Sequence, residues 1–137
     1  MDNLLSKFVF EKIGIPTYRR FLDLAAFRHK LISGNVANVS TPGYRARDID
    51  FKSEFAKMTQ ERNHLISRTT HPGHIRLGSH PTHPPDVLEE AVQQGEMNSV
   101  DIDREMSNLA QNELLFTTGA RLLQKKFDGL RKAITSK

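Results

Sequence analysis

The sequence predicts a mainly α-helical protein. A long N-terminal and a long C-terminal helix are expected to pair as an antiparallel, coiled-coil-like hairpin, with a small irregular or β-containing middle lobe. Two observations support this fold class: helical periodicity of apolar residues near both ends of the chain, and a polar stretch rich in Pro and His between them. With 137 residues, the chain has room for one modest domain.

The first predicted helix covers residues 18–39. When residues are placed 100° apart, its apolar side chains fall on one arc of the helix, with Leu24 and Leu31 on the flank. Thr17 is a candidate N-cap, and Thr41-Pro42-Gly43-Tyr44 should end the helix, because Pro-Gly fits the centre of a type II turn. Residues 17–44 are therefore expected to form one unit of helix and turn, preceded by an arm of residues 1–16 whose role stays open.

Residues 45–98 are expected to form the variable middle lobe, with a His- and Pro-rich tract at 64–85. A short helix is predicted from residue 51 to residue 58, with Asp50 as its cap. Asp86 and Glu89 are spaced as a capping box, which predicts another helix at 87–94. Residues 45–51 alternate in polarity, so a short strand is an open alternative there.

The second long helix is predicted within residues 99–137, with Asp101 as its N-cap. Alternating spacings of three and four residues place one set of side chains along a narrow face, as in a coiled coil. This helix would be about 50 Å long at ~1.5 Å per residue, too long for the rest of the chain to cover. We call this face the apolar stripe, although it includes one Glu: Ile102, Met106, Leu109, Glu113, Phe116, Ala120, Leu123, Phe127, Leu130 and Ile134.

A hairpin built from these two helices should be only marginally stable by itself. Burying a Leu or Phe side chain is worth roughly 2 kcal/mol, and ordering the backbone costs at least as much as the whole stripe supplies. We therefore expect the helices to complete their burial against helices of other subunits, and to be loosely ordered before assembly.

Composition excludes several classes of function. The net charge of +4 is too small to indicate a nucleic-acid-binding protein, and the absence of Cys excludes thiol chemistry. No apolar run is long enough for stable membrane insertion, and no cleavable signal peptide is recognisable at the start. Neither a phosphate-binding loop nor a nucleophile motif occurs, so we predict no enzyme activity and no cofactor.

Two motifs carry a family resemblance. Residues 33–51, SGNVANVSTPGYRARDIDF, resemble the N-terminal signature of bacterial flagellar axial proteins, and residues 98–106, NSVDIDREM, are similar to the segment that opens their C-terminal helix. The chain most resembles the flagellar basal-body rod protein family, and within it the proximal rod proteins of the FlgB type. The resemblance covers residues 17–58 and 95–134. Ser33-Gly34 departs from the Ala-rich residues usual there.

This resemblance implies a structural subunit of the proximal rod, which links the motor ring to the distal rod and transmits torque. The implied partners are further copies of the chain, other rod proteins, the ring-to-rod adaptor and, during secretion, the flagellar type III export apparatus. Such a subunit would reach the rod in the periplasm without a cleaved signal peptide.

The residues expected at subunit interfaces come from both helices and the turn. The Asn35 and Asn38 amides are expected to bond a neighbour's backbone and fix its register, and Tyr44 to make a partner contact. Glu113 either pairs with a basic residue of another subunit or lies partly in water; both readings stay open. The full set is Leu24, Leu31, Asn35, Asn38, Tyr44, Met106, Leu109, Phe116, Leu123, Phe127, Leu130 and Ile134.

Two other functions remain as alternatives. His71, His74, His80 and His83 form two H-P-x-H units, and a His-rich tract can bind zinc or nickel in a small metal-binding module. Pro inside each pair opposes the helical turn that would bring the two imidazoles together. The second alternative is a soluble coiled-coil adaptor with a fixed oligomeric state.

Overall fold

The structure, a computed structural model, describes residues 14–60 and 84–135. Most of the predicted arm at 1–16 lies outside the described residues, as does the His tract with His71, His74, His80 and His83. The alternative of a metal-binding module therefore falls outside the described residues.

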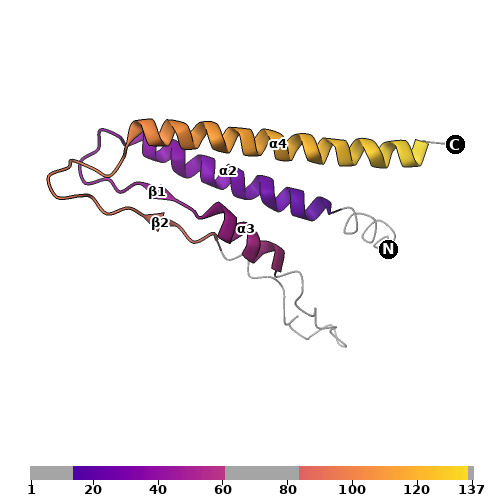
Figure 1. Ribbon diagram of the computed structural model, residues 1–137, viewed down its shortest axis with the longest axis horizontal. Helices are drawn as coiled ribbons and strands as arrows, with labels where there is room; N and C mark the ends of the chain where they lie inside the picture. Colours follow the sequence, from indigo (N-terminus) through magenta and orange to yellow (C-terminus); the bar gives the residue numbers. More distant parts are fainter. Residues whose placement is uncertain (1–13, 61–83, 136–137) are drawn as a thin grey trace, which may run out of the picture.

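Two long helices dominate the molecule, α2 (Ile15–Ala37) and α4 (Ile102–Thr135), and they run antiparallel to each other (Figure 1). Between them in sequence come β1 (Arg47–Asp48), α3 (Phe51–Gln60) and β2 (Leu88–Glu89). The strands and α3 lie along the side of α2 that faces away from α4 (Figure 1). The predicted fold class is confirmed, and α2 is the central layer.

The ends of α2 differ slightly from the prediction. The N-cap is Gly14, and Pro16 lies in the first turn, where a missing N–H costs no helical hydrogen bond. Thr17 is therefore not the cap. At the other end the helix stops at Ala37 and the predicted turn follows: Tyr44 N–H donates to the Thr41 carbonyl at 3.3 Å, and Gly43 has φ of 72°.

The structure of the middle lobe differs from the predicted helix at 87–94 and contains the short strand that was an open alternative at 45–51. Residues 87–94 do not form a helix: Leu88 and Glu89 pair antiparallel with Asp48 and Arg47. Glu89 lies in the strand β2 and pairs with Arg47, so it is not part of a helix capping box. The strand alternative at 45–51 is confirmed for Arg47–Asp48, and α3 begins as predicted, with Asp50 Oδ1 accepting from Ser53 N–H at 3.0 Å.

The apolar core lies between α2 and the lobe. Leu24 and Leu31, placed on the flank of the predicted arc, pack with Ile49 and are almost fully buried. They are buried because α2 is covered on two sides, by α4 and by the lobe. Aromatic side chains pack beside this core. The ring of Phe21 contacts the rings of Phe51 and Phe55 edge-on, with centroid distances of 5.2 and 5.4 Å.

The helix α4 begins as predicted, since Asp101 Oδ1 accepts from the Asp103 and Arg104 N–H groups. Its most buried residues are Glu105, Asn112 and Gly119, each seven positions from the next. The helix pairing was predicted correctly, but these polar and small residues, rather than the apolar stripe, form the line most deeply covered by α2. Among the described residues no helix is long and apolar enough to cross a membrane.

Candidate functional site: the junction of the two motifs

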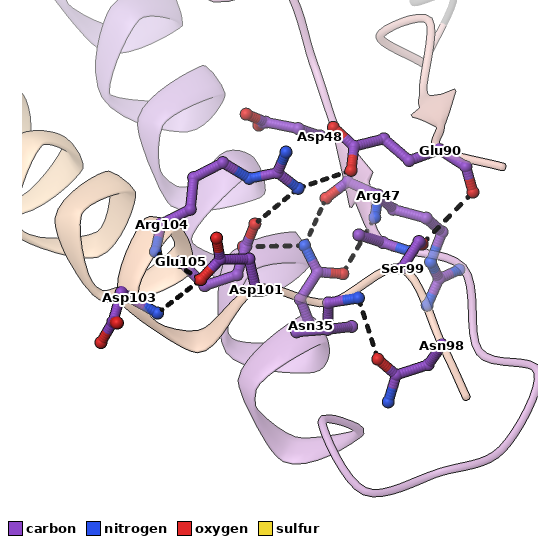
Figure 2. A network of polar contacts seen from close by, with 12 residues as sticks. Asn35, Arg47, Asp48, Glu90, Asn98, Ser99, Asp101, Asp103, Arg104 and Glu105 are labelled. Carbon is purple, nitrogen blue, oxygen red and sulfur yellow. Dashed lines mark hydrogen bonds and ion pairs between the residues drawn. The ribbon is translucent and has the colours of Figure 1, made fainter. Parts of the chain in front are cut away.

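Asn35, from the first motif, is the centre of a buried polar network at the closed end of the hairpin (Figure 2). Its Nδ2 donates to the Arg47 carbonyl at 2.8 Å and to Glu105 Oε2 at 2.9 Å. Its Oδ1 accepts from Arg47 N–H at 2.9 Å and from the Tyr44 hydroxyl at 3.3 Å. The amide therefore has a partner for both hydrogens and both lone pairs.

Backbone contacts join the two motifs on either side of Asn35. Gly43 N–H donates to the Met97 carbonyl at 2.8 Å, and Ser99 N–H donates to the Tyr44 carbonyl at 3.2 Å. Ser99 Oγ accepts from Ala46 N–H at 2.8 Å, and Asn98 Nδ2 donates to the Val39 carbonyl. We call the cluster of Asn35, Tyr44, Ser99 and Glu105 the motif junction.

Ion pairs extend the junction on both sides. Arg28 of α2 forms a bidentate pair with Asp48 of β1 at 2.7 and 2.8 Å, and Asp48 also accepts from Ile49 N–H. The hydrogen bonds that Arg28 donates to Asp48 raise the pKa of Arg28 above its ordinary value. Arg104 reaches from α4 to Glu90 beside β2 (Figure 2). The lobe is thus tied to both long helices.

This arrangement is suited to holding elements together. The junction's donors and acceptors bond one another, and no group of three His, Asp or Glu able to hold a metal ion occurs within residues 14–60 and 84–135. A fully satisfied buried network fixes the relative positions of its parts. The motifs therefore set the geometry of the hairpin.

The residues predicted for subunit contact divide into two groups. Leu24, Leu31 and Asn35 are buried by their own chain, and the Asn35 amide has no hydrogen-bonding capacity left for a neighbour. The expected register contact of Asn35 is thus replaced by an intramolecular one. Asn38 donates to the Gly34 carbonyl at 2.8 Å and accepts from Thr41, which stabilises the turn, and Tyr44 is half-buried against Asn35.

The second group lies on α4 and stays available. Met106, Phe116, Phe127 and Ile134 are 50, 42, 45 and 81% exposed, while Leu109, Leu123 and Leu130 are half-buried. Whether these side chains contact another subunit remains a prediction. The neighbouring Leu114 and Leu122 are also exposed and were not among the predicted interface residues. Glu105 was not predicted as a buried residue, although its seven-residue spacing to Asn112 and Gly119 was a visible signal.

Comparisons of the sequence with known proteins identify relatives of this chain. No protein-family model matches the chain. The flagellar basal body rod protein FlgB of Salmonella typhimurium is 33% identical over 119 residues, covering 82% of this chain and 86% of that protein. FlgB of Yersinia enterocolitica is 34% identical over 121 residues, with 82% and 87% covered. FlgB of Aquifex aeolicus is 27% identical over 121 residues, with 88% and 92% covered.

A helical hairpin closed by the two motifs, with relatives of this kind, defines a structural protein of the flagellar rod. The chain belongs to the FlgB family of flagellar basal body rod proteins.

Proposed function

We propose that this rod protein polymerises through the uncovered faces of its terminal helices, links the motor ring to the distal rod, and transmits torque. The observation that carries the proposal is the exposure of the apolar stripe on α4, where Met106 and Phe116 are 50% and 42% exposed. Large apolar side chains in a row mark an interaction surface rather than a solvent face.

The energetics favour association over isolation. Covering one such side chain is worth roughly 2 kcal/mol, so a few of them supply enough free energy for a specific contact. When identical subunits join through two different surfaces, each added subunit is rotated relative to the one before it. If these rotations do not close a ring, the subunits continue into an open helical polymer. A rod requires that geometry.

Torque transmission requires a subunit that does not shear. In this chain α2 is held by α4 on one side and by the lobe on the other (Figure 1), and the motif junction ties all three together. A load applied to α4 is thus passed to the lobe through Asn35 and Glu105.

The remaining parts of the proposal concern place and partners. Secretion through the flagellar type III apparatus without a cleaved signal peptide would deliver the chain to the rod in the periplasm. Its neighbours there would be further copies, other rod proteins and the ring-to-rod adaptor. Support comes from the family membership and the two matched motifs.

Self-association of the purified chain tests the proposal. The variant Met106→Ser/Phe116→Ser should stay monomeric in sedimentation at concentrations where the natural chain forms assemblies of mixed size that grow with concentration. Its control is Leu88→Ser/Met97→Ser, which removes two exposed apolar side chains from the lobe and should leave assembly unchanged. A discrete oligomer of fixed size would instead favour the coiled-coil adaptor. Deleting the gene should leave the cell envelope without rods and hooks in electron micrographs.

A further inference from the structure

We infer that a hollow between α2 and α4 is a receptor for an Arg or Lys side chain of a second copy of this chain. The inference rests on the proposed self-association and adds the chemistry of one contact. The hollow has a volume of about 450 Å³ and is lined by Ala26, His29, Asn112, Glu113, Phe116 and Thr117.

The first argument is an unpaired acceptor. Asn112 is 1% exposed, and its Nδ2 donates to the Ala25 carbonyl at 2.9 Å. Its Oδ1 is buried and accepts no hydrogen bond among the described residues. Buried polar atoms without a partner are rare because they lose their bonds to water and gain none in return. A donor supplied from outside the chain would satisfy this oxygen.

The second argument is charge. Glu113, the one charged residue in the apolar stripe, lies in the same hollow, and no described residue forms an ion pair with it. The half-exposed Phe116 ring lies beside it. A carboxylate, an amide and an aromatic ring in the lining of one hollow match the chemistry of a cationic head group on an alkyl stem.

The third argument identifies the source of that cation. The far half of α4 carries five exposed basic residues and one acidic residue, Asp128, and none of the five forms an ion pair among the described residues: Arg121, Lys125, Lys126, Arg131 and Lys132. The nearest, Arg121, lies about 12 Å from Glu113 along the helix axis, at ~1.5 Å per residue. Each copy thus has an unfilled acceptor and unused donors on one helix, so a donor of one copy can pair with the acceptor of another.

The chemistry of the hollow is tested first, without any need for assembly. Isotope-labelled protein is titrated with butylguanidinium, and with butylurea as the uncharged isostere, while the side-chain amide signals of Asn112 are followed by NMR. We expect saturable shifts with butylguanidinium, at least tenfold weaker binding of butylurea, and at least fivefold weaker butylguanidinium binding in Glu113→Gln. The control Glu96→Gln, an exposed carboxylate on the lobe, should bind like the natural chain. An unmoved Asn112 signal, or equal binding by Glu113→Gln, would overturn the inference.

The identity of the partner is tested next by disulfide trapping. Because the chain has no Cys, only the introduced cysteines can form disulfides. Thr117→Cys protein is mixed with a differently tagged copy carrying a Cys at one of the five basic positions. At least one pair should form a disulfide between copies, whereas Thr117→Cys with Glu96→Cys should not. If the copies associate and no basic position traps, the second copy is not the partner. If butylguanidinium binds while the natural chain stays monomeric, the proposed polymerisation fails and the receptor chemistry stands.

Discussion

Asn35 Nδ2 donates a 2.9 Å hydrogen bond to Glu105 Oε2, although 70 residues separate the two in sequence. The two residues are 0% and 2% exposed. This bond connects the end of α2 to the start of α4, and the same amide holds both backbone polar groups of Arg47. One side chain therefore positions three elements of the fold.

Removing this amide should destabilise the protein strongly. Asn35→Ala leaves the Glu105 carboxylate and the Arg47 backbone buried with partners missing, so we expect a loss of about 3 kcal/mol in the free energy of unfolding. Urea denaturation followed by circular dichroism measures it. The control is Asn38→Ala, which loses only turn contacts at the surface and should cost about 1 kcal/mol or less. Equal losses in the two variants would contradict a central role for Asn35.

Gly119 allows the close approach of α2 and α4. A Cβ at this position would lie 2.8 Å from two ring carbons of Phe21 and 3.3 Å from Leu22 Cδ2. Gly119→Ala should therefore push the helices apart and lower the free energy of unfolding by about 1–3 kcal/mol. Gly129→Ala, in the same helix with nothing within 4 Å of the new Cβ, should stabilise the protein by up to ~1 kcal/mol through helix propensity. A gain at both positions would rule out close packing at Gly119.

The turn after α2 depends on a left-handed residue. Gly43 has φ of 72°, a left-handed conformation that Ala rarely adopts. A Cβ at this position would meet nothing within 4 Å, so Gly43→Ala should cost free energy through backbone strain and not through clashes with neighbouring atoms. We expect a loss of about 1 kcal/mol in thermal or urea unfolding. Gly43→Asn should lose less, because Asn tolerates this conformation better. If Ala and Asn were equally tolerated, the turn would not require a left-handed residue.

Protection from hydrogen exchange should vary along α4. The segment 105–119 packs against α2 through Glu105, Asn112 and Gly119, whereas the C-terminal end of α4 extends beyond the N-terminal end of α2 (Figure 1). At low protein concentration, amides at 127–135 should exchange at least tenfold faster than those at 105–119, since few tertiary contacts oppose their opening. Under assembling conditions the difference should shrink. Uniform strong protection in the monomer would contradict a C-terminal end that becomes ordered on assembly.

The helix caps and the turn after α2 could be predicted from short stretches of sequence. The Asp101 cap, the Thr41–Tyr44 turn and the Asp50 cap of α3 follow from the preferences of a few neighbouring residues. The two long helices follow from the apolar periodicity along each segment. Such signals act over four to seven positions, so one sequence displays them. The two motifs likewise led to the family without a structure.

The tertiary structure alone decided which faces are covered. Residues 87–94 have helix-cap spacing, yet Leu88 and Glu89 pair with β1, because ladder partners 40 and 42 positions away in sequence outweigh a weak local preference. Asn35 was expected to bond a neighbouring subunit's backbone, and the structure instead surrounds its amide with Glu105 and Arg47 of the same chain. Burial of a polar group depends on partners brought by the fold, and periodicity cannot show which side of a helix those partners occupy.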